Sequence, residues 1–281
     1  MANKQSARLK ALGINAVLNI AHRGARAFAP ENTLAAFAKA KLFGCQMFEL
    51  DVRFSKDREL MVHHDESLMR CTDVQLKFPA LSHYDFADFT VAQLSQLDAG
   101  SWYTQQLLLP ANQRQAFMQT LAAEEIAPFI SAEDIAYYQS GVVKIPTLKQ
   151  ALELAQAMQM LVNIELKTKQ AFDTTLADAV VKLVKALDME QRVLISAFEH
   201  EQLRRVRQLN ATIAIGVLTN QALQNPSSYC HALDADAYHP NGYREDPVTG
   251  GRILDVTGFS AVRQNGQGVN VWTCNRQTDM Y

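Results

Sequence analysis

Short apolar segments alternate with amphipathic helical patterns along most of this 281-residue chain, and this alternation limits how it can fold. The apolar segments are rich in β-branched residues and are expected to be strands, at residues 16–24, 47–52, 59–65, 161–167, 192–198, 212–219, 234–241 and 268–275. Helices are expected between many of them, at residues 32–42, 147–158, 173–187, 200–209 and 258–265. The alternation predicts an α/β fold, in which helices cover a parallel sheet. The number of strands favours a TIM (β/α)8 barrel over an open doubly wound sheet, since no G-x-G-x-x-G motif follows the first strand.

One long stretch does not fit the alternation. Residues 66–144 follow the third expected strand and show helical patterns at residues 91–97, 112–123 and 132–139, without a convincing strand. We therefore expect a single barrel domain over residues 1–281, with a mainly helical insertion at about residues 66–144. Few residues follow the last expected strand, so we also expect the barrel to lack its C-terminal helix.

The composition excludes some classes of function. The formal charge is −2, from 27 Lys and Arg against 29 Asp and Glu, and the chain has no basic stripe, which argues against nucleic-acid binding. No apolar run approaches the length of a membrane span. The N-terminal residues lack the apolar core of a signal peptide, so a cytoplasmic location is expected; a leader removed beforehand would instead fit a periplasmic or secreted protein. The sequence does not indicate an oligomeric state.

Two carboxylates occur close together in the second expected strand. Residues 47–65 read MFELDVRFSKDRELMVHHD. Glu49 and Asp51 are two residues apart, so on a strand they point to the same face. Carboxylates forced together among apolar neighbours repel each other and lose solvation, and a divalent cation is the simplest group that compensates them.

Polar residues lie at the ends of the other expected strands as well, where the active site of a parallel barrel is found. Glu165 supplies a third carboxylate, and these oxygen ligands suit Mg²⁺ or Ca²⁺ better than zinc. Lys167 is two residues further on the same face and would place a positive charge beside the cation. Each residue alone is more often structural, but the set indicates a site for an anionic substrate. The strand-end residues are His22, Arg23, Glu49, Asp51, His63, His64, Asp65, Glu165, Lys167, Ser196, His239, Asn241, Trp272 and Asn275.

Histidines at such a site can act as an acid–base pair. His63 and His64 cannot both point inward from a regular strand. We prefer His64, which adjoins Asp65, partly because of the family resemblance described next. Arg23 reaches the site only if the first strand ends before it, and Gly24 would permit such a bend.

Five segments resemble, in order, the motifs of the glycerophosphodiester phosphodiesterases. They are AHRGARAFAPENTLAAFAKA, FELDVRFSKDRELMVHHDESLMRCTD, IPTLKQALELA, NIELK and VNVWTCN. Each motif alone is weak, but the ordered series covers nearly the whole barrel and leaves mainly the insertion unexplained. The resemblance implies a TIM-type barrel that cleaves glycerophosphodiesters to sn-glycerol 3-phosphate and an alcohol.

The resemblance also implies roles for individual residues. In the implied mechanism, a neighbouring glycerol hydroxyl attacks the phosphorus and gives a cyclic phosphate that water then opens. Trp272 would line the pocket for the glycerol or alcohol group, although it can equally fill the barrel. The other implied roles are acid–base catalysis by His22 and His64, phosphate contact by Arg23 and Lys167, and binding of one divalent cation, Mg²⁺ or Ca²⁺, by Glu49, Asp51 and Glu165.

Some alternatives stay open. In the Pro-Glu-Asn-Thr segment, capping of the next helix by Asn32 or Thr33 is favoured over contact with substrate. The competing functions are lysophospholipase D-type cleavage of lysolipids and a catalytically inactive barrel that binds phosphodiesters. The aromatic residues of the insertion either shape a pocket or form a small core; they are Phe78, Tyr84, Phe86, Phe89, Trp102, Tyr103 and Phe117.

Overall fold

The computed structural model describes residues 6–14, 16–119, 123–126, 128–168, 172–245, 248 and 252–274. The chain divides into two compact units. The N-terminal unit is Leu18–Val162, and the C-terminal unit is Met1–Val17 together with Asn163–Tyr281. Strand β4 (Leu161–Leu166) carries the chain from one unit into the other. A single domain over residues 1–281 stays a prediction.

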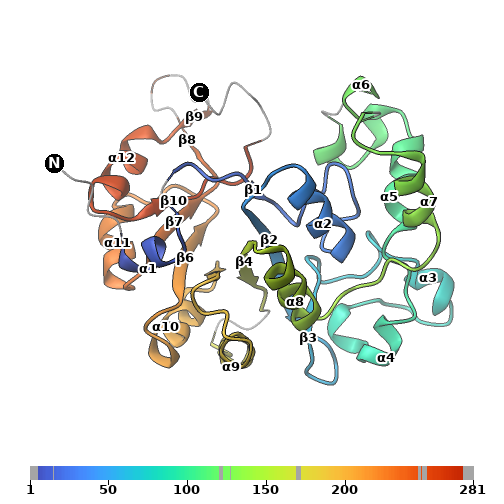
Figure 1. The fold of residues 1–281 in the computed structure, drawn as a ribbon, viewed down its shortest axis with the longest axis horizontal. Coiled ribbons are helices and arrows are strands. Elements are labelled where there is room, and N and C mark those ends of the chain that lie inside the picture. Colours follow the sequence, from blue (N-terminus) through green and yellow to red (C-terminus); the bar gives the residue numbers. More distant parts are fainter. Residues whose placement is uncertain are drawn as a thin grey trace. The chain divides into compact units, whose positions relative to one another are not determined.

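The N-terminal unit contains the first three strands, β1 (Ile20–Ala21), β2 (Met47–Phe54) and β3 (Leu60–Val62). β1 pairs with β2 in parallel, and β3 turns back to pair with β2 in antiparallel (Figure 1). The prediction of β3 as a further parallel barrel strand is therefore wrong. The short polar stretch between β2 and β3 leaves no room for a crossover helix, so only a hairpin can form.

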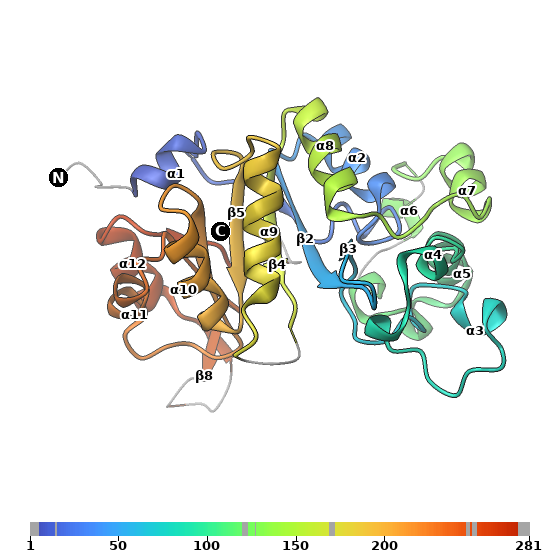
Figure 2. The same cartoon turned by 90° about the horizontal axis from the view of Figure 1, so that it is seen from below.

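Helices α2 (Leu34–Leu42) and α8 (Leu148–Met158) pack against each other in this unit (Figure 2). Both are preceded by a threonine that caps the helix. The Thr33 hydroxyl accepts a hydrogen bond from the Ala36 N–H, and Thr147 forms a capping box with Gln150. The predicted capping role of the Pro-Glu-Asn-Thr segment is confirmed for Thr33.

The insertion is helical in the described residues, as expected. Its elements are α3 (Val74–Lys77), η1 (Phe86–Asp88), α4 (Val91–Leu94), α5 (Ser101–Leu108), η2 (Ala111–Gln113), η3 (Ala116–Met118), α6 (Ala123–Ile126) and α7 (Ala132–Gln139). The prediction of one long helix at residues 112–123 is wrong, because short 3-10 turns occupy the part of that segment that the structure describes.

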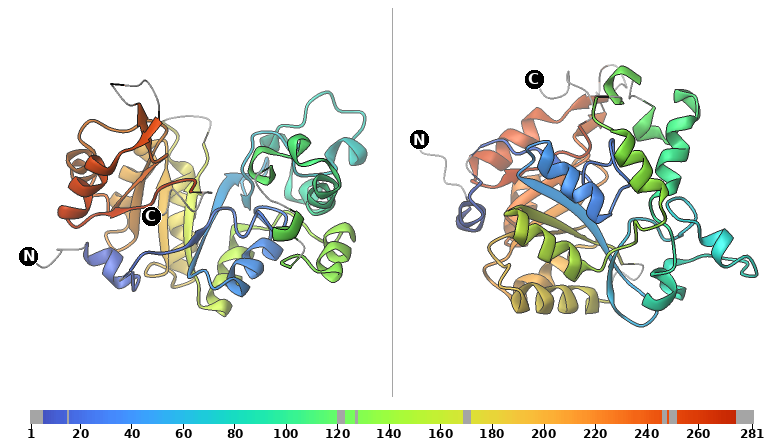
Figure 3. Two further views of the ribbon diagram at one scale, coloured as in Figure 1. Left: turned by 90° about the horizontal axis from the view of Figure 1, so that it is seen from above. Right: turned by 45° about the vertical axis from the view of Figure 1, so that its right-hand side comes forward.

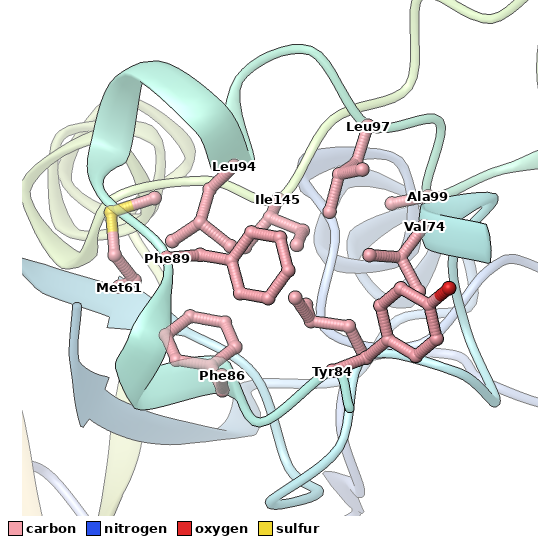
Figure 4. Close-up of a cluster of buried hydrophobic side chains, with 10 residues drawn as sticks. Met61, Val74, Tyr84, Phe86, Phe89, Leu94, Leu97, Ala99 and Ile145 are labelled. Atoms are coloured by element: carbon pink, nitrogen blue, oxygen red, sulfur yellow. The ribbon is translucent and has the colours of Figure 1, made fainter. Parts of the chain in front are cut away.

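Two apolar clusters hold the insertion together. In the first, rings from η1 and its surroundings point toward side chains of β3 and α4 (Figure 4); its members include Met61, Tyr84, Phe86, Phe89, Leu94 and Ile145. Phe78 is partly buried and packs against this cluster. The second joins α5 and α7 to α2 and includes Ala36, Trp102, Tyr103, Met118 and Tyr138, with Phe117 partly buried at its edge. Most of the insertion's aromatic residues therefore form its own core.

The C-terminal unit contains parallel strands in the order β5-β6-β7-β10. Helix α10 packs against β5, β6 and α9, while α11 packs against β7 and α12 (Figure 3). This arrangement confirms the α/β class with parallel strands. The bounds are α1 (Ala7–Ala11), α9 (Thr175–Ala186), β5 (Val193–Ala197), α10 (His200–Leu209), β6 (Ala214–Thr219), α11 (Pro226–Ala232), β7 (Ala237–Pro240), β8 (Tyr243–Glu245), β9 (Arg252–Leu254), α12 (Val256–Gln264) and β10 (Gly268–Val269).

None of the helices found in the described residues has the length and apolar character needed to cross a membrane. The expected absence of a C-terminal helix concerns residues 275–281, which lie outside the described part of the chain.

A buried carboxylate anchors α1 to the strands of the C-terminal unit. Asp236 is 1% exposed, and its oxygens accept hydrogen bonds from Arg8 at 2.8 Å, from Arg207 at 3.0 Å and from the Ile215 N–H at 2.9 Å. Asp234 pairs with the same two arginines, but its side chain is 61% exposed. The two aspartates therefore differ mainly in burial.

We expect Asp236→Asn to lower the free energy of unfolding by about 3–5 kcal/mol, because Arg8 and Arg207 lose the buried negative charge with which they pair. Asp234→Asn is the matched control and should cost less than about 1 kcal/mol, since its ion pairs are exposed to water. Urea unfolding of both variants measures the difference, and equal losses would contradict this account.

Candidate active site

The chain bends sharply directly after β1. Arg23 and Gly24 both have left-handed backbones, with φ of 57° and 75°. A Cβ at Gly24 would lie 2.7 Å from the backbone of Ala36, so only glycine fits there. The bend that was expected at Gly24 is confirmed, and it aims the Arg23 N–H at Glu49 Oε2, 2.7 Å away.

Glu49 and Asp51 are both buried on β2, with 6% and 0% exposure. Asn32 holds Asp51 through two contacts: its Nδ2 donates to Asp51 Oδ2 at 2.8 Å, and its Oδ1 accepts from the Asp51 N–H at 3.3 Å. Arg23 Nε lies 3.6 Å from Asp51 Oδ2. Both carboxylates are thus fixed by neighbours in the loop between β1 and α2. Sequence reasoning favoured a cap for Asn32 or Thr33; Thr33 is the cap, and Asn32 orients Asp51.

His22 lies beside this pair. Its Nε2 is 3.8 Å from Glu49 Oε2, and its buried Nδ1 has no hydrogen-bond partner among the described residues. Burial, followed by the nearby charges of Arg26 and Arg23, lowers the pKa of His22 well below its usual value. The imidazole is therefore neutral at pH 7 and can accept a proton.

The two adjacent histidines have different surroundings. His63 is buried, with its ring stacked on Phe86 at 5.0 Å and its Nε2 3.3 Å from the Ser67 carbonyl oxygen. Burial lowers the pKa of His63 to about 4. His64 is only partly buried, and its Nδ1 lies 2.5 Å from Asp65 Oδ1. An imidazole oriented by a carboxylate is suited to proton transfer, whereas His63 has the contacts of a structural residue.

An ion-pair network that sequence reasoning missed links Arg23 to Asp65, the carboxylate that contacts His64. Glu31 is 5% exposed and accepts hydrogen bonds from Arg23 at 2.9 Å and from Arg70 at 2.6 Å. Arg70 also donates to Asp65 at 2.5 Å. Although burial would raise the pKa of Glu31, the hydrogen bonds and charges of the two arginines lower it to about 2. Arg70 lies in the loop after β3 and not at the end of the strand, so the spacing of residues in the sequence did not point to it.

The C-terminal unit carries the remaining predicted residues. Glu165, 7% exposed, forms an ion pair with Lys167. Lys167 Nζ lies 5.7 Å from the centre of the Phe198 ring, which meets Trp272 edge-on at 5.6 Å. Phe198 was not predicted as a site residue, although it directly follows β5 and so lies at a strand end.

The other strand-end residues have structural partners. The His239 ring fills the space beside Gly216, where a Cβ would lie 2.3 Å from it, and its backbone oxygen accepts from Trp272 Nε1 at 2.8 Å. Ser196 donates to Asn163 at 2.9 Å, and Asn241 donates to the Asn220 carbonyl at 2.6 Å. Asn275 lies outside the described residues.

Three buried acidic side chains could hold a metal ion in the described part of the chain: Glu49, Asp51 and Glu165. The donor set fits a hard divalent cation, because it consists of carboxylate oxygens and includes no thiol. The hydrogen bonds that Asn32 and Arg23 make to Asp51 and Glu49 support the same assignment, since metal ligands are commonly oriented by such neighbours.

A comparison with known families is decisive. The model of the glycerophosphoryl diester phosphodiesterase family matches residues 22–281. The chain belongs to this family. It is accordingly a phosphoric diester hydrolase, and the resemblance seen in the sequence is confirmed.

Individual relatives agree. The chain is 30% identical over 263 residues to a glycerophosphodiester phosphodiesterase of Caldanaerobacter subterraneus subsp. tengcongensis, covering 94% of this chain and 88% of the relative. It is also similar to a solved phosphodiesterase of Oleispira antarctica in complex with the product sn-glycerol-3-phosphate, with a TM-score of 0.69, 26% identity and coverage of 93% and 87%. A glycerophosphodiester phosphodiesterase of Thermotoga maritima shares the fold, with a TM-score of 0.61, 24% identity and coverage of 94% and 89%.

Glu31 provides a test of the ion-pair network. Because its folded-state pKa of about 2 lies below the ordinary value of 4.5, the carboxylate stabilises the fold above pH 4.5 and loses this effect as the pH falls toward 2. We expect Glu31→Gln to lower the free energy of unfolding at pH 7 by about 3 kcal/mol and to remove that part of the pH dependence. Glu153→Gln, in an exposed pair with Lys149, is the control and should change neither. A Glu31→Gln variant with the wild-type pH profile would refute the assignment.

Proposed function

We propose that this protein hydrolyses glycerophosphodiesters to sn-glycerol 3-phosphate and an alcohol, with the help of one divalent cation. The observation that carries the proposal is the position of His22, whose Nε2 lies 3.8 Å from Glu49 Oε2, beside two buried and oriented carboxylates on β2. The product bound to the Oleispira antarctica relative supports the glycerol 3-phosphate end of the substrate. No observation favours cleavage of lysolipids or an inactive barrel. A cytoplasmic location stays a prediction.

In this proposal Glu49, Asp51 and Glu165 bind the cation, which is Mg²⁺ or Ca²⁺. When bound, the cation would polarise a phosphoryl oxygen and offset negative charge that develops there. Asn32 keeps Asp51 in place by hydrogen bonds to its carboxylate and its backbone N–H. The Arg23 N–H performs the same task for Glu49.

His22 and His64 are the proposed acid–base pair. His22, in its neutral form, can take the proton from the attacking glycerol hydroxyl. His64, which Asp65 orients, can protonate the leaving alcohol. Attack by the neighbouring hydroxyl gives a cyclic phosphate, which water then opens with the histidines in exchanged roles.

Arg23 and Lys167 are the proposed phosphate contacts, and Trp272 the proposed contact for the glycerol or alcohol group. Lys167 pairs with Glu165 and lies above the Phe198 ring, so its ammonium is held close to a proposed ligand of the cation. The edge of Trp272 against Phe198 gives an apolar wall, as would suit the carbon atoms of a polyol.

Removal of the metal tests the cofactor. We expect chelation to abolish the release of glycerol 3-phosphate from glycerophosphocholine, and Mg²⁺, Ca²⁺ or Mn²⁺ to restore it. Asn32→Ala should weaken binding of the restoring cation by about 10- to 100-fold, as measured by calorimetric titration of metal-free protein, because Asp51 loses its orienting partner. Activity that survives complete chelation would overturn the proposal.

Substitution of the adjacent histidines tests the acid–base assignment. His64→Ala should lower kcat by about 10²- to 10⁴-fold with an unchanged melting temperature, because it removes a proton-transfer group. His63→Phe keeps the stack on Phe86 and should lower stability while kcat stays within an order of magnitude of wild type. His22→Ala should resemble His64→Ala. The assignment would be wrong if His63→Phe lost activity and His64→Ala kept it.

A further inference from the structure

Arg26 lies in the loop between β1 and α2 and has a different environment from its neighbouring arginines. It is partly buried, and its guanidinium makes no hydrogen bond or ion pair with any described residue. The contact that holds it is the ring of Phe117, whose centre is 4.6 Å from the guanidinium carbon. Phe117 belongs to η3 of the insertion, so this contact joins the insertion to the segment that bears His22.

The nearby carboxylates are already engaged by other arginines. Glu31 is bound by Arg23 and Arg70, and Glu49 accepts a hydrogen bond from the Arg23 N–H. Burial, and then repulsion from Arg23, lowers the pKa of Arg26 to about 10. A partly buried cation that is repelled by a second cation and makes no hydrogen bond or ion pair with a described carboxylate is poorly compensated, so an incoming anion would gain a strong contact here.

The position of Arg26 indicates which part of a substrate it meets. Its aromatic partner Phe117 belongs to the insertion, a separate segment from the strands β2 and β4 that carry the proposed metal ligands. The variable part of a glycerophosphodiester is its alcohol, and an insertion is the natural place for residues that recognise it.

We propose that Arg26, seated on Phe117, selects glycerophosphodiesters whose alcohol part carries a second phosphate over those whose alcohol is neutral or cationic. This inference rests on the proposed function. A charged hydrogen bond from the guanidinium to that phosphate favours the anionic diester, and the same positive charge repels a choline group. Phe117 fixes the guanidinium without neutralising it, which leaves the charge available to the ligand.

The test compares three substrates: glycerophosphoinositol, its 4-phosphate and glycerophosphocholine. We expect the wild-type kcat/KM to be highest for the phosphorylated diester and lowest for the choline diester. Arg26→Gln should lower the ratio of the phosphorylated to the choline substrate by about 10- to 100-fold, the usual effect of losing a hydrogen bond to a charged group. Phe117→Leu, which keeps the apolar packing but removes the ring face, should lower the same ratio by a smaller factor.

Arg58→Gln is the matched control. Arg58 is an exposed arginine that also stacks on a phenylalanine, with its guanidinium carbon 3.9 Å from the centre of the Phe54 ring. The Arg58→Gln variant loses the same charge and the same kind of contact. An unchanged ratio of kcat/KM between the phosphorylated and the choline substrate in this variant therefore shows that the effect is specific to Arg26.

Three results would overturn the inference. An equal loss of kcat/KM with all three substrates would place Arg26 on the transferred phosphate instead of the alcohol. An unchanged ratio with a lower melting temperature would make Arg26 a packing residue. Wild-type protein that hydrolyses none of the three substrates would contradict the proposed function itself, which distinguishes that failure from the first two.

Discussion

The burial of two carboxylates on one strand is the constraint on which the candidate site depends. Glu49 and Asp51 point to the same side of β2 with almost no exposure, so their charges need nearby compensation. The loop after β1 supplies it from the Arg23 N–H, the Arg23 side chain and the Asn32 amide. Arg23 and Asn32 both have left-handed backbones, a conformation that concentrates at functional sites. The conformation of this loop therefore places hydrogen-bond donors beside both carboxylates.

A network of ion pairs links this arrangement to His64. Glu31 binds Arg23 and Arg70, and Arg70 in turn binds Asp65, which orients His64. The segments around His22, Glu31 and His64 are thus joined by alternating charges, although they are distant in sequence. Such a network holds side chains in fixed rotamers, which is what proton transfer to and from a positioned substrate requires.

Sequence reasoning identified the α/β class and the strand-end residues because both follow from periodicity. Helices α7 and α10 begin and end where they were expected, at residues 132–139 and 200–209. The direction of β3 was missed, although the short polar stretch between β2 and β3 is too short for the crossover helix that a parallel strand needs. Arg26, Glu31 and Arg70 were missed as functional candidates for a related reason: they lie in loops, where three-dimensional proximity and not spacing brings charges together. Asn32 was noticed but assigned to a cap, the commoner role of asparagine before a helix.

The central claim is that Glu49, Asp51 and Glu165 bind one divalent cation. The most direct measurement is anomalous diffraction from crystals of the protein grown with Mn²⁺. The account predicts one strong anomalous peak within about 2.0–2.6 Å of an oxygen of each of the three carboxylates, the range for hard cations and oxygen ligands. A peak bound by other residues, or a peak that Glu165 does not reach, would contradict it.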